Sequence, residues 1–352
     1  MFLYFTILDK IILPFIVVLP VLIATAYFTL AERKILASVQ RRIGPAVVGF
    51  WGILQPIADG LKLLTKENLV PSNANKLVWH VTPFASLGFS FFGWYIINSN
   101  SQLIISSLNY GILFTFLISS LNVYWVFLAG WFGRGQYGVL GSLRAISQLL
   151  SYELALSLLI LPIILFSGSL NYNNIIYIQT ISTWFIFPLL PCAVLYFICI
   201  LAETNRIPFD LLEAEAELVA GYYTEFSGFW FASFFLSEYG NMLVMSCVYV
   251  SFFLGAGQSF IFSGFFDGLF LDLFFYVKAV TIVFIFIFLR ANLPRFRFDQ
   301  LMIIGWKILL PLILSFIFFY VGLILFLNCS NILQVPFINL PYVYILSNSS
   351  HI

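Results

Sequence analysis

Long apolar stretches dominate this chain, and they restrict its fold more than any other feature. Only 9% of the 352 residues are charged and 62% are apolar, with a mean hydropathy of +1.02, whereas ordinary soluble domains carry roughly 25% charged residues. The stretches are too long and too continuously apolar for the strands of a membrane barrel, so we predict an all-α membrane protein. Because about 20 apolar residues cross a bilayer as a helix, we expect a bundle of about eight transmembrane helices, over residues 3–31, 79–98, 104–130, 145–167, 181–202, 229–255, 269–290 and 303–327.

Basic residues divide the loops into two classes. When the loops are numbered from the first span, the even loops contain no lysine or arginine. Lys10 and Lys278 lie near the N-terminus and inside the seventh span. The other 14 of the 16 basic residues lie in the odd loops or at their borders: Arg33, Lys34, Arg41, Arg42, Lys62, Lys66, Lys76, Arg134, Arg144, Arg206, Arg290, Arg295, Arg297 and Lys307. By the positive-inside rule, the odd loops face the matrix or cytoplasm and both termini face the opposite side.

One segment after the first span is amphipathic. Apolar residues recur at helical spacing from Phe50 to Leu64, opposite Gln55, Asp59 and Lys62, which predicts a helix over about 50–66 that lies in the membrane interface. We therefore expect a single transmembrane domain over 1–327, with an acidic loop at 203–225. A tail over 328–352 follows and contains no Lys, Arg, Asp or Glu.

Composition excludes several classes of function. The 16 basic residues nearly cancel the 15 acidic ones, so no basic surface attracts nucleic acid. Four well-separated cysteines and two histidines are too few for an iron–sulfur cluster, haem or zinc site of the usual kind. The sequence at 133–138 fits G-x-G-x-x-G, but it follows a membrane span and lacks a βαβ unit, so we interpret it as a flexible loop.

An ionisable residue inside a span costs at least ~2.5 kcal/mol to bury in lipid and is a functional candidate by default, and we single out three such residues. Glu153 and Glu238 lie at comparable depth from the odd side, and Lys278 reaches a depth at which it could pair with either of them. The alternative is a purely structural ion pair between Lys278 and one of the two carboxylates, which would explain two of these three residues. The second carboxyl would be left unpaired, which suits a group that carries protons.

The loop between the fifth and sixth spans is the densest cluster of acids. Its pattern predicts that Glu203 pairs with Arg206 at i, i+3, and that Asp210 shares a helical face with Glu213 and Glu217. A solvated face is the usual explanation of such a run. Here apolar residues interleave the acids and spans flank them, so we predict partial burial and a path that accepts protons. Seven acids belong to this run: Glu203, Asp210, Glu213, Glu215, Glu217, Glu225 and Glu238.

Several motifs in order along residues 31–307 resemble one family, subunit 1 of proton-pumping NADH:quinone oxidoreductase (respiratory complex I). These are A-E-R-K-I-L-A at 31–37 with Gln40, Arg42 and Gly44-Pro45; L-Q-P at 54–56 with Ala58-Asp59 and Lys62; Arg144-Ala145 with S-Y-E at 151–153; the acidic loop at 202–221; F-F-L at 234–236 with Glu238-Tyr239; and P-R-F-R-F-D-Q-L-M at 294–302 with Trp306-Lys307. Departures from the family pattern are Ala46, Arg134, Tyr223 and Glu225-Phe226.

The resemblance implies a membrane subunit that binds ubiquinone as substrate and itself holds no flavin, iron–sulfur cluster or metal. Its partners would be membrane lipids, peripheral quinone-module subunits and antiporter-like membrane subunits. Its location would be the mitochondrial inner membrane, with both termini facing the intermembrane space. The implied residues are, for the quinone chamber, Arg33, Gln40, Arg42, Trp51 and Asp59; for a proton path, the seven acids with Glu153 and Lys278; and for the peripheral-arm interface, Arg206, Arg290, Arg295 and Asp299.

Three alternatives remain open at this stage. An ion-coupled secondary transporter would use the buried acids and lysine for coupling, although no internal repeat is visible. A purely structural anchor for the peripheral arm would leave catalysis intact when Glu153 or Glu238 is neutralised. Within the same superfamily, the chain could instead serve a related membrane hydrogenase or plastid dehydrogenase.

Overall fold

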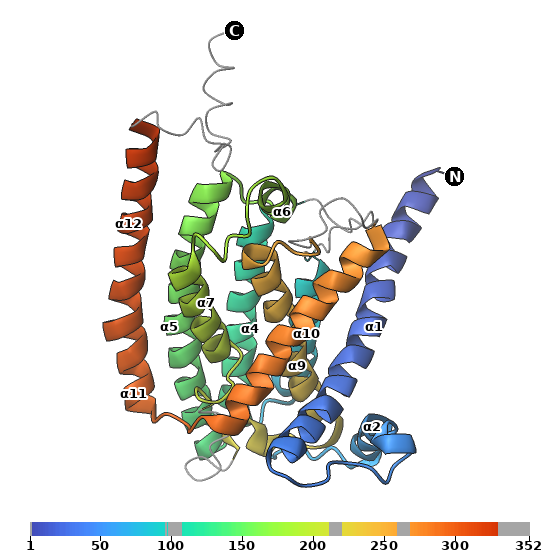
Figure 1. Ribbon diagram of the computed structural model, residues 1–352. Coiled ribbons are helices and arrows are strands. Elements are labelled where there is room, and N and C mark those ends of the chain that lie inside the picture. Colours follow the sequence, from blue (N-terminus) through green and yellow to red (C-terminus); the bar gives the residue numbers. More distant parts are fainter. Residues whose placement is uncertain (1, 96, 98–107, 211–219, 259–267, 330–352) are drawn as a thin grey trace.

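A computed structural model describes residues 2–95, 97, 108–210, 220–258 and 268–329, and these residues form helices and no strands. The long helices lie side by side as a bundle (Figure 1). The helices predicted as membrane spans are α1 (Phe2–Val39), α3 (Lys76–Phe92), α4 (Gly111–Gly133), α5 (Gln136–Ser167), α7 (Leu190–Glu203), α9 (Gly228–Phe253), α10 (Gly268–Asn292) and the run of α11 (Phe298–Ile303), the π-helical turn η4 (Ile304–Leu309) and α12 (Leu310–Cys329).

The all-α membrane class is confirmed. Four helical stretches in the described part of the chain are long and apolar enough to cross a bilayer: Gly111–Gly133, Gln136–Ser167, Phe270–Asn292 and Phe298–Phe326. These four stretches do not establish the number of eight spans, which stays a prediction. The odd-loop ends of the helices gather at the lower end of Figure 1, beside α2.

The fifth predicted span is wrong at its start. Residues 182–189 turn rather than continue a helix, and α7 begins only at Leu190, with Pro191 in its first turn. Proline fixes φ and lacks an N–H, so it starts helices readily but disrupts their interior. The short helix α6 (Tyr172–Ile181) precedes this turn. The helix α7 is only about 21 Å long.

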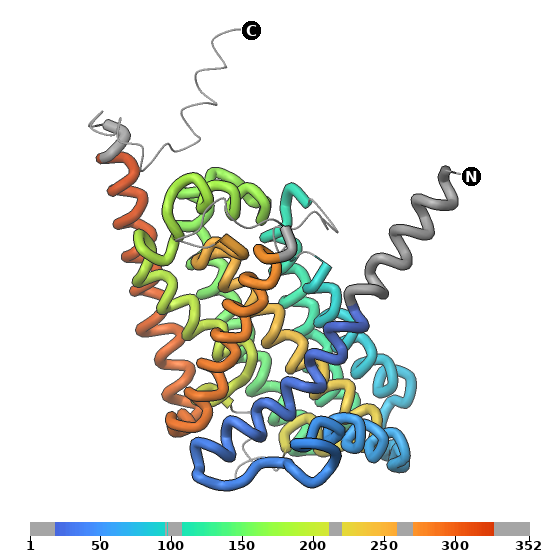
Figure 2. Tube along the Cα trace, turned by 45° about the vertical axis from the view of Figure 1, so that its right-hand side comes forward, coloured from blue at the N-terminus to red at the C-terminus, as the bar shows by residue number. Residues whose placement is uncertain are grey.

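The predicted interfacial helix corresponds to α2 (Gln55–Thr65), preceded by the 3-10 turn η1 (Phe50–Gly52). Figure 2 shows α2 beside the lower end of α1. The apolar side chains of Ile57, Leu61 and Leu64 are all more than half exposed in the chain by itself. This face therefore needs lipid, a ligand or another subunit to cover it.

Candidate functional site: a buried acid and arginine cluster

Glu32, near the lower end of α1, accepts hydrogen bonds from three side chains. Arg206 Nη1 donates to its Oε1 at 2.9 Å, Arg290 also pairs with Oε1, and Tyr239 OH donates to Oε2 at 2.6 Å. Glu32 is 4% exposed. Two guanidinium groups and a hydroxyl around one buried carboxylate stabilise its ionised form.

Arg206 connects this carboxylate to a second acid. Its Nε lies 3.7 Å from Glu238 Oε1, and its guanidinium lies 4.6 Å from the Tyr239 ring centroid. Burial lowers the pKa of Arg206, but Glu32, Glu238 and Tyr239 outweigh that effect and hold the pKa above its ordinary value. Arg206 is thus a permanent cation shared by Glu32 and Glu238.

Two of the sequence predictions for Arg206 fail. The predicted pair with Glu203 does not form, because the partners of Arg206 come from α1 and α9. Its placement at the peripheral-arm surface is also wrong, since the side chain is buried even in the chain by itself. Arg290 likewise turns toward Glu32, whereas Arg295 and Asp299 are exposed, and their role at the peripheral-arm surface stays a prediction.

The loop after α7 is held against its neighbours on both sides. Gln148 Nε2, on α5, donates to the carbonyls of Ala202 and Phe209 at 2.9 and 2.8 Å. On the other side, Arg295 Nη2 donates to Asp210 Oδ2 at 3.0 Å, and the Phe296 amide donates to the Pro208 carbonyl. These bonds fix the loop that follows Glu203 and carries Arg206. Glu213, Glu215 and Glu217 lie outside the described residues.

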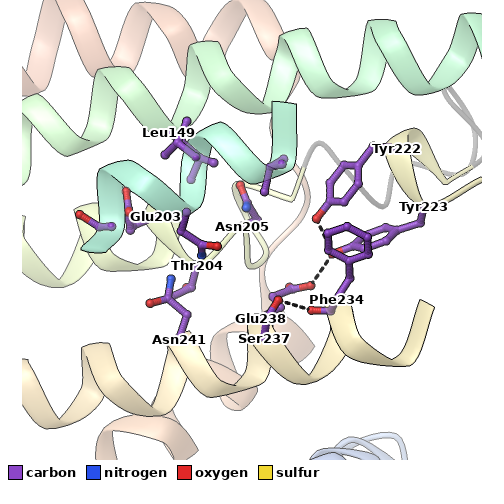
Figure 3. Close-up of a pocket in the computed structure, with 14 residues that line it drawn as sticks. Leu149, Glu203, Thr204, Asn205, Tyr222, Tyr223, Phe234, Ser237, Glu238 and Asn241 are labelled. Carbon is purple, nitrogen blue, oxygen red and sulfur yellow. Dashed lines mark hydrogen bonds between the residues drawn. The ribbon is translucent and has the colours of Figure 1, made fainter. Parts of the chain in front are cut away.

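A cavity of about 40 Å³ lies between Glu203 and Glu238 (Figure 3). A cavity needs about 10–15 Å³ for each water molecule that it holds, so this one has room for roughly three water molecules. Three buried acceptor atoms on its wall have no hydrogen-bond partner among the described residues: Glu203 Oε2, Asn205 Oδ1 and Asn122 Oδ1. Orphaned acceptors around a space of this size favour bound water.

Glu153 opens toward a different space. It is partly buried and lies in a groove of about 550 Å³ between α4, α5 and the α11–α12 run, with an otherwise mostly apolar lining. The charge of Glu153 also acts on Glu203. Glu153 and Glu203 lie on α5 and α7, two helices that contact each other.

Lys278 does not pair with Glu153 or Glu238 as the sequence suggested. Its ammonium donates to the carbonyls of Leu254, Ala256 and Gln258 at 2.6–2.8 Å and lies 4.3 Å from the Trp184 ring centroid. These carbonyls follow the C-terminal end of α9, where orphaned carbonyls attract cations. The contacts of Lys278 are those of a cap on that helix.

The residues predicted for the quinone chamber gather around the lower end of α1. Arg33 pairs with Asp59 of α2 at 2.7 Å, and Gln55 donates to the same carboxylate at 3.0 Å. Trp51 has a left-handed backbone, with φ of 56°, and its carbonyl accepts from Lys34. Gln40 and Arg42 are exposed beyond the helix end, where α1 gives way to a turn.

One glycine of the G-x-G-x-x-G sequence, Gly135, and Gly141 just beyond that sequence serve packing. A side chain on Gly135 would come within 2.1 Å of Glu225 Oε1, and one on Gly141 would meet the backbone of Gly221 at 2.7 Å. The lack of side chains at Gly135 and Gly141 therefore lets the segment that carries Glu225 lie against the junction of α4 and α5.

Glu32 and Tyr239 were missed as site residues, although both stand inside motifs that resemble the family. The available signal was an acid placed immediately after a predicted span and directly before Arg33 and Lys34, where a solvated residue is the usual expectation.

Comparison with known proteins places most of the sequence in one family. A family model described as NADH dehydrogenase matches residues 12–321. "NADH-ubiquinone oxidoreductase chain 1" of Chondrus crispus is 44% identical over 312 residues, which cover 89% of this chain and 95% of the relative. The same-named chain of Arabidopsis thaliana is 45% identical, covering 85% and 92%. A bacterial relative, from the NADH-quinone oxidoreductase of Rhodospirillum rubrum, is 43% identical, covering 84% and 88%.

Proposed function

Because this chain belongs to the NADH dehydrogenase family, we propose that it is a core membrane subunit of NADH:ubiquinone oxidoreductase, forms the membrane part of the quinone chamber and couples quinone reduction to proton translocation. The carrying observation is the buried cluster from Glu32 through Arg206 to Glu238, next to a cavity of water size. Charges this costly to bury are retained in membranes chiefly for ion pathways.

The quinone part of the proposal is supported by the lower end of α1. There, α2 carries both an exposed apolar face and Asp59, the partner of Arg33, and the ring of Trp51 just before α2 is also exposed. An isoprenoid tail needs an apolar path, and a quinone headgroup needs hydrogen-bond partners near its end. Electrons would come from partner subunits, since this chain's role is to hold and enclose the substrate.

The proton part follows from the coupling of charges. When the headgroup is reduced near Arg33 and Asp59, the local charge changes, and the shared cation Arg206 lies between the lower end of α1 and Glu238. One pKa unit corresponds to about 1.4 kcal/mol, so linked protonation steps transmit part of the redox energy. The proposed path contains Glu153, Glu203, Asp210, Glu225 and Glu238, together with Glu213, Glu215 and Glu217.

The assembly would consist of peripheral quinone-module subunits on the odd side and antiporter-like subunits beside this chain in the lipid. The location would be the mitochondrial inner membrane, with both termini in the intermembrane space. This orientation is supported by the sorting of 14 of 16 basic residues to the odd loops.

Substitution of Glu203 by Gln tests the proposal in the assembled enzyme. The change keeps the shape and removes the charge, so we expect quinone-reductase turnover to fall at least about tenfold while the complex still assembles. Glu67→Gln is the matched control, because Glu67 is exposed and outside the cluster. Unchanged turnover in Glu203→Gln would instead support the anchor role.

A further inference from the structure

Two adjacent tyrosines extend from the short helix η3 (Gly221–Glu225) to Glu238. Tyr222 OH donates to Tyr223 OH at 2.7 Å, and Tyr223 OH donates to Glu238 Oε2 at 3.1 Å (Figure 3). Each tyrosine is 4% exposed, and both line the cavity that also contains Glu203. Because a tyrosine hydroxyl both donates and accepts, the pair forms an unbroken hydrogen-bonded chain from the cavity wall to the carboxylate.

The ring of Tyr223 is held independently of its hydroxyl. It stacks on Phe235 with centroids 5.2 Å apart and meets the edges of Phe231 and Phe234 at 5.8 and 5.9 Å. Such aromatic contacts fix the ring plane. The hydroxyl therefore points at Glu238 because of ring packing, and a phenylalanine at this position would keep the packing and lose only the hydrogen bonds.

Glu238 is consequently fixed at both carboxylate oxygens. Oε1 faces Arg206 Nε, and Oε2 accepts from Tyr223. A carboxylate held in this way presents the same oxygen to the same donor in each cycle, as proton transfer over hydrogen-bond distance requires.

We propose that Tyr223 is a positioning residue for Glu238 and that the Tyr222–Tyr223 hydroxyl pair relays protons between the cavity and Glu238 Oε2. The inference rests on the proposed function, because it assigns the route by which one acid of the path is loaded.

The relay balances at every atom. Tyr223 gives its phenolic proton to Glu238 Oε2 and takes the phenolic proton of Tyr222. Tyr222 in turn takes a proton from a hydronium ion or a protonated carboxylic acid at the cavity. Each phenol loses one O–H bond and gains one, so neither is left charged, and one proton has moved from the cavity to Glu238. Rotation of the hydroxyls then restores the original chain.

Tyr223→Phe in the complete enzyme tests the proposal. We expect kcat for quinone reduction to fall roughly tenfold, the effect of losing a hydrogen bond to a charged group, while KM for quinone is unchanged. Tyr172→Phe is the matched control, since Tyr172 is equally buried and bonds Thr115 at 3.3 Å, away from this cavity. Wild-type kcat in Tyr223→Phe, or a change in KM alone, would overturn the positioning role.

A double-mutant cycle with Glu238→Gln separates this inference from the proposed function. If Tyr223 acts through Glu238, Tyr223→Phe adds no further loss to Glu238→Gln. A full additional loss in that background would overturn the relay. If Glu238→Gln alone keeps wild-type turnover, the proposed function fails at this acid. If Glu238→Gln is slow but Tyr223→Phe is not, only the tyrosine inference fails.

Discussion

Glu32 binds together parts of the chain that are far apart in sequence. Its partners Arg206, Tyr239 and Arg290 lie 174, 207 and 258 residues away. The carboxylate and the Arg206 side chain are 5% and 6% exposed, so solvent does not screen the pair. Removing one member of a buried pair costs more than the net value of the pair, because the remaining charge stays buried without compensation.

Glu32→Gln should therefore destabilise the assembly strongly. The change removes the anion that Arg206 and Arg290 share and leaves only Glu238, at 3.7 Å, beside Arg206. Breaking a buried pair costs up to about 3–5 kcal/mol, and we expect the temperature of half-inactivation to drop by several degrees. Asp59→Asn is the comparison, because its pair with Arg33 is 36% and 54% exposed and contributes about 0–1 kcal/mol. Equal stability of the two variants would show that Glu32 is not the anchor.

Lys278 leads to a separate prediction. Lys278→Met removes three hydrogen bonds to the carbonyls after α9, each from a charged donor and worth about 1.5–3 kcal/mol. We expect less assembled enzyme but an unchanged number of protons pumped per electron in the enzyme that remains. A stable enzyme with fewer pumped protons would return Lys278 to the proton path.

At the scale of elements, the junction of α4 and α5 sets the position of η3. A methyl group on Gly141 would meet the Gly221 backbone at 2.7 Å, whereas one on Gly138 would meet only backbone oxygens at 3.8 and 4.0 Å. Both glycines lie near the start of α5. The close approach at Gly141 is therefore what brings the Tyr222–Tyr223 segment against the cavity.

Gly141→Ala should impair the enzyme and Gly138→Ala should not. Alanine at 141 forces one backbone away from the other, so we expect turnover and assembly both to fall, whereas alanine at 138 improves helix propensity by about 1 kcal/mol. Blue-native gels and quinone-reductase assays of the two variants measure the difference. Normal turnover in Gly141→Ala would mean that η3 can shift without consequence.

Sequence periodicity located most helices because hydropathy is a local property. The interfacial helix and the spans of α9 and α10 appear close to their predicted positions in the described part of the chain, whereas α5 begins at Gln136, well before the predicted start at 145. The start of the fifth span was wrong because Pro188 and Pro191 interrupt an apolar run that hydropathy alone reads as continuous.

At the scale of the whole molecule, the identity of the candidate residues was more predictable than their pairing. Charged residues are rare in an apolar span, so Glu153 and Glu238 could be selected as candidates from the sequence alone. The i, i+3 rule proposed Glu203 for Arg206, but tertiary packing supplied Glu32 from α1 instead. The partners of Lys278 were also unpredictable, because they are backbone carbonyls, which every residue carries.

A density map of the complete enzyme with ubiquinone bound tests the central claim most directly. We predict that density for the isoprenoid tail runs between the lower part of α1 and the apolar face of α2. We also predict ordered water in the cavity between Glu203 and Glu238. A quinone that lies wholly against other subunits, together with a dry cavity, would contradict the assignment of a quinone chamber and proton path to this chain.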